Sequence, residues 1–160
     1  MKKSIKLVLE YILLFCIFGG IYFLLESFWK HHWTDWRMFL LSGFIGLCIG
    51  AINNLFTYET DFLLQCIVGM LIALLCECIF GYQWNIVEGL ELWNYSNPPL
   101  SYLSAVGGQI NLLFAVMWLG LSGVCIFLDD WIWYYILGHR DKKPYYKVFG
   151  KVIFKGGSHD

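Results

Sequence analysis

The chain has 160 residues, of which 59% are hydrophobic and only 14% are charged, and its formal net charge is −1. A soluble domain carries about 25% charged residues, so this chain lacks the polar surface that would keep a compact globule in water. The composition excludes an ordinary soluble protein and predicts one integral membrane domain. Nucleic-acid binding is not expected, because the only basic run is the tail of a membrane protein.

Four apolar runs are long enough to cross about 30 Å of hydrocarbon as helices of roughly 20 residues. They are residues 5–25, 38–56, 62–82 and 110–128. The first run follows two lysines, as in a signal peptide, but it is longer than a typical signal core and ends at Glu26 without a small-x-small cleavage site. We therefore expect the first run to remain as a membrane span.

The predicted fold is all-α, an integral membrane bundle of four transmembrane helices within a membrane domain of residues 1–138. An outer connecting segment, residues 83–109, joins the third and fourth spans. The aromatic run 131–137 is too short to span and is expected to lie at the membrane interface. Residues 139–160 form a basic cytoplasmic tail in this interpretation.

The connecting segment contains a signal for a short helix. Asn97 followed by two prolines is typical of a helix start. The helix would run over residues 98–106 and end at Gly107-Gly108. Such a helix before the fourth span is either re-entrant or interfacial, and its short apolar length favours the interfacial placement.

The distribution of basic residues predicts the orientation. Nine of the eleven lysines and arginines lie before residue 7 or after residue 139. An even number of spans places both termini on one side, and the positive-inside rule makes that side the cytoplasm. We expect a multi-pass protein of the bacterial inner membrane with both termini cytoplasmic.

Small residues recur at four-residue intervals on the second and third predicted spans. In lipid, helices associate by close packing, so small side chains mark their contacts. The residues predicted to pack helices together are Ser42, Gly46, Gly50, Gly69, Ala73 and Gly81.

Polar side chains within the spans form two groups, and each buried carboxylate requires a partner, water or a proton. The candidate outer polar site comprises Glu26, Glu77, Asn85, Tyr95 and Gln109, with Glu77 as the strongest candidate. The candidate inner polar cluster comprises Asn53, Asn54, Gln65, Asp129 and Asp130. The spans are nearly all apolar between the two groups, which is not the pattern of a continuous polar pathway.

Metal and cofactor sites are not expected. His31, His32 and Asp35 have a spacing that could bind a metal, but histidines among tryptophans are typical of a membrane interface. The six cysteines fall inside apolar runs without a Cys-x-x-Cys motif, so we expect small buried hydrophobes rather than disulfides.

Part of the chain, residues 19–135, resembles small bacterial membrane proteins of the type IV ABC-transporter permease family. The most specific matching segments are Trp-Asn-Tyr-Ser (93–96) and Gly-Gln-Ile (108–110). At the position of Asn94 the family's pattern has aspartate, so a role that requires a carboxylate there is not expected. The other residues that carry the resemblance are Gly19, Gly20, Tyr22, Glu26, Met38, Phe39, Asn53, Gln65, Glu77, Gly81, Asn85, Pro98, Trp118 and residues 128–130.

The resemblance implies a transport component, and the buried polar residues agree with this. The sequence lacks Gly-x-x-x-x-Gly-Lys-[Ser/Thr], so an ATPase would be a separate subunit. Four spans are few for a pathway, so transport would require a homo-oligomer in the lipid bilayer.

Two alternatives remain at this point. One is a non-catalytic accessory protein or holin-like pore former. The other is an intramembrane enzyme on a lipid-linked substrate, with Glu26 and Glu77 as acid and base. The sequence favours a non-enzymatic role.

Overall fold

The structure is a computed structural model that describes residues 2–155. Within these residues, four helices are long and apolar enough to cross a membrane, which confirms the predicted all-α bundle. They are α1 (Lys2–Lys30), α2 (Trp36–Gly50) with its extension α3 (Ile52–Leu55), α4 (Phe62–Gly81) with the π-helical extension η1 (Tyr82–Val87), and α5 (Leu112–Trp131) with the π-helical extension η3 (Ile132–Ile136).

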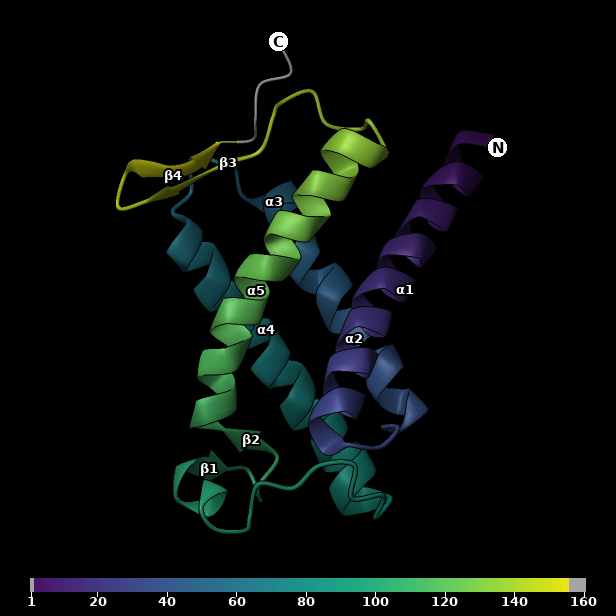
Figure 1. Ribbon diagram of the computed structural model, residues 1–160, viewed down its shortest axis with the longest axis vertical. Helices are drawn as coiled ribbons and strands as arrows, with labels where there is room; N and C mark the ends of the chain where they lie inside the picture. Colours follow the sequence, from purple (N-terminus) through teal and green to yellow (C-terminus); the bar gives the residue numbers. More distant parts are fainter. Residues whose placement is uncertain (1, 156–160) are drawn as a thin grey trace.

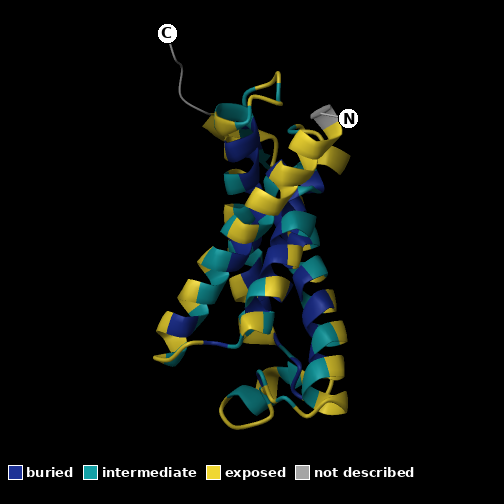
Figure 2. Cartoon of the chain, turned by 90° about the vertical axis from the view of Figure 1, so that its right-hand side faces the viewer, coloured by how far each residue is buried: buried dark blue, intermediate teal, exposed yellow. Residues whose placement is uncertain are grey.

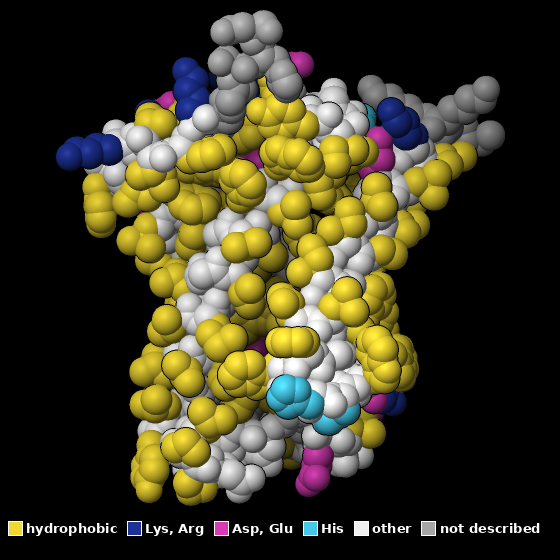
Figure 3. Space-filling model, in the orientation of Figure 1, with side chains coloured by type: hydrophobic (Ala, Val, Ile, Leu, Met, Phe, Trp, Pro, Cys, Tyr) yellow, Lys and Arg dark blue, Asp and Glu magenta, His cyan; other side chains and the backbone are white. Residues whose placement is uncertain are grey.

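The two ends of the bundle differ in what they carry. Figure 1 shows both chain termini at one end and the segment between α4 and α5 at the other. We name these the inner end and the outer end, in keeping with the predicted orientation. On the face shown in Figure 3, apolar side chains predominate between the two ends, as expected for a surface that faces lipid.

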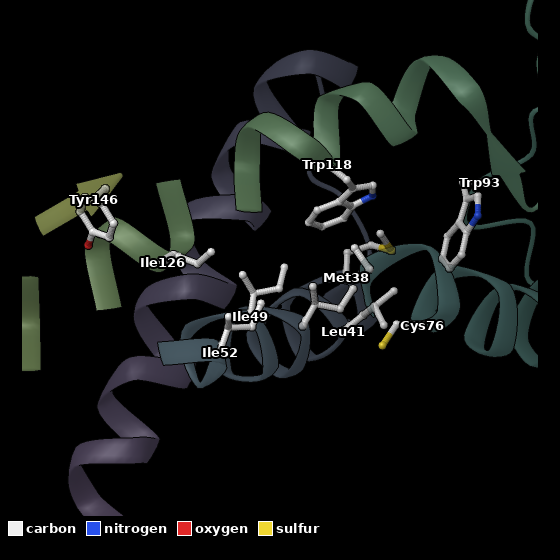
Figure 4. Packing of buried hydrophobic residues seen from close by; sticks show 11 residues of the cluster. Met38, Leu41, Ile49, Ile52, Cys76, Trp93, Trp118, Ile126 and Tyr146 are labelled. Atoms are coloured by element: carbon white, nitrogen blue, oxygen red, sulfur yellow. The ribbon is translucent and has the colours of Figure 1, made fainter. Parts of the chain in front are cut away.

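Helix α2 lies at the centre of the bundle and is the most buried of the four spans. It contacts α1, α4 and α5, and α4 also packs along α5. Buried residues follow the inward faces of the helices, while the outward faces are exposed (Figure 2). The core is apolar and includes Ile45, Ile49 and Ile126, each at most 1% exposed. Figure 4 shows the buried hydrophobic side chains of this core from close by.

Close contacts at small residues allow this packing. All six of the predicted packing residues are buried. An added Cβ at Gly46 would collide with Phe18 of α1, and one at Gly50 would lie 2.6 Å from Asp129 of α5. On α4, a Cβ at Gly69 would lie 2.7 Å from Ser122 of α5. The small residues of α2 and α4 thus accommodate side chains of α1 and α5.

Three helices extend beyond their predicted ends. Helix α4 continues through η1 to Val87, past the predicted end at residue 82. Helix α1 reaches Lys30, because its charged side chains lie at the membrane boundary and nothing breaks the backbone. The fourth span begins at Leu112 and continues helically through Asp129 and Asp130 to Ile136. The aromatic run 131–137 is therefore mostly a helical continuation, since the two carboxylates that precede it are compensated within the bundle, as described below.

The predicted helix over residues 98–106 is wrong. Only one 3-10 turn forms, η2 (Leu100–Leu103), and Asn97 makes no side-chain cap for it. The chain then enters β1 (Ser104–Ala105), which pairs antiparallel with β2 (Ile110–Asn111).

Backbone conformation explains the hairpin. Val106, Gly107 and Gly108 have φ values of 52°, 62° and 78°, which reverse the chain and cannot continue a helix. A side chain at Gly108 would also collide with Ser96. The two glycines therefore specify a tight turn rather than a helix stop.

The basic segment after the bundle folds back onto the inner end. Strands β3 (Tyr145–Val148) and β4 (Lys151–Lys155) form an antiparallel hairpin. Tyr146 is only 2% exposed, and its ring lies 4.6 Å from that of Phe62 on α4. Hydrogen bonds from Lys147 and Tyr145 hold the pKa of Glu59 below its usual value, in the loop before α4. Residues 156–160 of the predicted tail lie outside the described residues.

The packing of α2 against α1 makes a prediction about glycine. We expect Gly46→Ala to lower the free energy of unfolding by about 1–3 kcal/mol, because the new methyl group collides with Phe18. Gly120→Ala is the matched control, since a Cβ there meets no atom within 4 Å. Thermal unfolding in detergent, followed by a thiol-reactive dye that reports exposure of the buried Cys66 and Cys76, measures both variants. Equal melting temperatures for the two variants would contradict the packing described here.

Candidate functional site

A small cavity lies within the bundle at its outer end. Its volume of ≈ 20 Å³ is enough for about one water molecule. Helix α1 contributes Tyr22 and Glu26, and α4 contributes Glu77. Trp93 and Tyr95 of the connecting segment cover it. Apolar residues of α2, together with Trp118 of α5, form most of the remaining wall.

Glu77 is the most deeply buried carboxylate of this cavity, with 5% of its surface exposed. Its Oε1 accepts a hydrogen bond of 2.9 Å from Nε1 of Trp118. Its Oε2 has no hydrogen-bond partner among the described residues. The pairing of α4 with α5 brings the two side chains together, 41 residues apart in the sequence.

Glu26 is compensated by a cation on its own helix. Lys30 Nζ lies 2.8 Å from Glu26 Oε1, one helical turn away. The same ammonium donates to Thr34 Oγ1 at 3.4 Å and to the carbonyl of Leu92 at 3.3 Å. Glu26 Oε2 is buried and, like Glu77 Oε2, has no hydrogen-bond partner among the residues described. Lys30 thus neutralises Glu26 and ties the end of α1 to the connecting segment.

Aromatic rings form two walls of the cavity. Tyr22 stacks on Trp118, with ring centroids 5.6 Å apart. Tyr95 stacks on Phe114, with centroids 4.5 Å apart. Burial, and to a smaller extent the nearby Glu77, raises the pKa of the Tyr95 phenol, so this group is a neutral hydroxyl.

Asn85 and Gln109 hold the cover in place rather than line the cavity. Asn85 Nδ2 donates to Gln109 Oε1 at 2.7 Å, and Asn85 Oδ1 accepts from the backbone N–H of Leu92 at 2.7 Å. The carbonyl of Gln109 accepts from Trp93 Nε1 at 3.0 Å. Gly81 makes room for this contact, because a Cβ there would lie 2.7 Å from Gln109 Oε1.

The structure therefore divides the predicted outer polar site. Glu26, Glu77 and Tyr95 line one cavity, whereas Asn85 and Gln109 position its cover. Sequence reasoning missed Tyr22, Lys30 and Trp118 as site residues. The signals were present, since Tyr22 and Lys30 lie one helical turn on either side of Glu26, and Trp118 is the tryptophan in the middle of a predicted span.

The inner polar cluster is built around Arg140. Its guanidinium lies 2.5 Å from Asp130 Oδ1 and 3.3 Å from Asp129 Oδ2. Asp130 is fully buried and also accepts hydrogen bonds from Asn53 Nδ2 at 2.5 Å and from the hydroxyl of Tyr146 at 2.7 Å. Burial disfavours the charge of Arg140, but Asp130, Tyr58 and Asp129 together outweigh it and hold the pKa of Arg140 above its ordinary value.

Four of the five predicted inner residues come together in this cluster. Asn54 Oδ1 lies 3.5 Å from Arg140, while Gln65 is apart and donates to the carbonyl of Thr60 at 3.1 Å. Sequence reasoning missed Arg140, Tyr58 and Tyr146, because nothing in a linear pattern places the tail on the bundle. Tyr58 accepts from Arg140 at 2.9 Å.

An apolar layer separates the two sites. Figure 4 shows Ile49, Ile52 and Ile126 between Trp118 at the outer side and Tyr146 at the inner side. The buried hydroxyls within the bundle, on Ser42 and Ser122, are bonded to carbonyls of their own helices at 2.6 and 2.7 Å. The described bundle thus encloses two polar sites without a polar path between them.

The histidines near the outer end are not arranged as a metal site. Asp35 caps α2, accepting from the backbone N–H of Arg37 at 2.8 Å. His32 contacts the carbonyl of Trp33. Within residues 2–155, no three His, Cys, Asp or Glu side chains are grouped to hold a metal ion. All six cysteines are unpaired.

Comparison with the models of known protein families, with curated proteins and with solved structures finds no match for this chain. The geometry of the two polar sites is therefore the basis for assigning a function.

The inner cluster predicts the effect of losing its cation. Arg140→Gln leaves Asp129 and Asp130 buried without their counter-charge, which costs about 3–5 kcal/mol for a buried pair. We expect faster hydrogen–deuterium exchange in β3 and β4 and a lower melting temperature. Lys151→Gln, an exposed change on β4, serves as the control.

A second substitution tests whether the effect of Arg140→Gln comes from the carboxylates that it leaves unpaired. Adding Asp130→Asn to Arg140→Gln removes one of the uncompensated charges and should recover part of the lost protection. Exchange rates for Arg140→Gln that equal those of Lys151→Gln would show that the ion pairs do not hold the hairpin.

Proposed function

We propose that this protein is a permease-like component of a membrane transporter, which acts with partner subunits at the outer polar site. Its four apolar helices make it an integral membrane protein. The observation that carries the proposal is Glu77, a carboxylate 5% exposed whose Oε2 faces a covered cavity without a hydrogen-bond partner among the described residues.

The energetic cost of Glu77 supports a functional role. A carboxylate within a transmembrane helix costs up to about 2.5–3.5 kcal/mol on insertion scales, the value for the helix centre. If Glu77 served only to pack the helices, leucine would fit the apolar core better. If it served only to accept a hydrogen bond from Trp118, glutamine could do so without a charge. Ionisable groups kept inside membrane bundles mark ion and substrate sites.

The arrangement of the bundle supports a carrier more than a pore. A pore requires a continuous wet path, whereas Ile45, Ile49 and Ile126 close the bundle between its two polar sites. A cavity of ≈ 20 Å³ is also too small for a lipid-linked substrate, which disfavours the enzymatic alternative. A covered site at one end, with an apolar layer behind it, is suited to binding and releasing a small species.

The sequence also indicates which partner subunit this function would require. The sequence has no phosphate-binding Gly-x-x-x-x-Gly-Lys-[Ser/Thr] motif, so an ATPase would be a separate subunit, as the resemblance to type IV ABC-transporter permeases implies. The basic residues at both termini favour a cytoplasmic inner end in a bacterial inner membrane. The outer polar site then faces the outer leaflet.

Ion flux tests the role of Glu77. We expect the purified chain in proteoliposomes that contain a pH-sensitive dye to move protons when a potassium-diffusion potential is imposed. Glu77→Gln should reduce this flux to the level of protein-free liposomes, because it removes the ionisable group and keeps the hydrogen-bonding shape. Glu91→Gln, which changes an exposed carboxylate in the connecting segment, is the matched control and should retain the flux.

Two results would overturn the proposal. One is a Glu77→Gln or Glu77→Leu variant that inserts and transports like the wild type. The other is a wild-type chain that shows no flux and isolates from its native membrane without an ATPase.

A further inference from the structure

We propose that the outer cavity binds one exchangeable proton, which is held on Glu77 and shared with Glu26. This inference rests on the proposed function, because it names the species that the outer polar site takes up. It stands on three observations: the charge balance of the cavity, the two carboxylate oxygens without hydrogen-bond partners, and the volume of the cavity that Glu26 and Glu77 line.

The charges around the cavity do not cancel. Glu26 and Glu77 are two carboxylates, and Lys30 is the one cation in contact with either of them among the described residues. The other titratable groups that line it, the phenols of Tyr22 and Tyr95, are neutral at ordinary pH.

Groups on the neighbouring elements do not alter this balance. On α2, Arg37 pairs with Asp35 at 3.1 Å, so their charges cancel. On α4, Cys76 beside Glu77 is a thiol that is uncharged at neutral pH. With both carboxylates ionised, the site would carry one uncompensated negative charge. A buried charge of this kind is neutralised rather than tolerated, so one positive charge must enter.

The hydrogen-bonding geometry assigns that charge to a proton on Glu77. Lys30 already compensates Glu26 at 2.8 Å, whereas Glu77 receives only the neutral N–H of Trp118 at 2.9 Å. A protonated carboxyl group is a donor and an ionised one is an acceptor. Glu77 Oε2–H can therefore donate to the free Oε2 of Glu26, directly or through one water.

The size of the cavity argues for a proton over a metal cation. A hard cation takes about six oxygen ligands, and the space of ≈ 20 Å³ holds about one water. Its walls are largely aromatic and aliphatic. Two free carboxylate oxygens are enough to share a proton but are too few to replace the hydration shell of a metal ion.

The exposure of the two carboxylates suggests the route of entry. The side chain of Glu26 is 11% exposed and that of Lys30 is 27% exposed, so this ion pair lies toward the solvent at the outer end. A proton delivered by hydronium to Glu26 leaves water behind and passes to the more deeply buried Glu77. Glu77 returns the proton to solvent through Glu26.

Infrared spectroscopy of the purified chain in lipid vesicles tests the proposal. A protonated carboxyl group has a carbonyl band that ionised carboxylates lack and that shifts in heavy water. Asp129 and Asp130 also share one cation and can contribute a band of their own. At neutral pH we therefore expect the difference spectrum between the wild type and Glu77→Gln to contain the band of the Glu77 carboxyl group. The exposed change Glu91→Gln should leave the band unchanged.

Charge balance makes opposite predictions for two further variants. Lys30→Gln removes the resident cation, so a second carboxyl group must be protonated and the part of the band that Glu77→Gln removes should roughly double. Glu26→Gln leaves Lys30 to balance Glu77, so Glu77 should ionise and the band should fall to its level in Glu77→Gln. Circular dichroism establishes whether each variant keeps its helices. If one variant fails to fold, the band intensity of the other variant tests the proposal.

Several outcomes would overturn the proposal: a wild type without the band, a Glu77→Gln variant with the full wild-type intensity, or a folded Lys30→Gln with wild-type intensity. Loss of the wild-type band when sodium replaces a large organic cation in the buffer would also overturn it, because the site would then hold a metal ion. The band reports binding without transport. A band present without ion flux would therefore contradict the transport role and leave the proton site standing. Flux without the band would contradict a proton held on Glu77 at rest and leave the transport role standing.

Discussion

Carboxylates buried in a bundle that faces hydrocarbon are the constraint on which this structure depends. Each such charge must be compensated locally, because no bulk water reaches it. At the inner end, Arg140 compensates Asp129 and Asp130, and this contact fastens the C-terminal hairpin to the bundle. At the outer end, Lys30 compensates Glu26, while Glu77 receives a single neutral donor. At the inner site both carboxylates contact the one cation, whereas at the outer site Glu77 contacts no cation among the described residues.

The apolar helices make this difference between the ends possible. Helix α2 approaches α1 and α5 closely because Gly46 and Gly50 present no side chain at the contacts. The resulting core of isoleucines leaves no polar route between the ends. Dispersion contacts and close packing hold such a bundle together in lipid, since burial from water gives no driving force there. The outer cavity is consequently a local space between the four helices and the connecting segment rather than part of a channel.

Much of the fold could be read from the sequence, and the site only in part. Long apolar runs predict spans because hydrocarbon admits few other structures, and the four helices follow them. Glu26 and Glu77 could be paired because both lie near the same end of their spans. Arg140 could not be placed, because a contact between a tail and a bundle leaves no periodic pattern. The helix expected over residues 98–106 did not form, since the backbone at Val106, Gly107 and Gly108 favours a turn.

The sequence by itself determined that the chain is a four-helix membrane protein with polar residues gathered near both ends, because the cost of exposing polar backbone to lipid leaves one solution for runs of this length. Only the tertiary structure decided which polar groups are compensated. That depends on distances between side chains on different helices, such as Trp118 to Glu77 and Arg140 to Asp130. Electrostatic energy falls with separation in space and not with separation along the chain. The unbalanced carboxylate of the outer cavity is therefore a property of the fold.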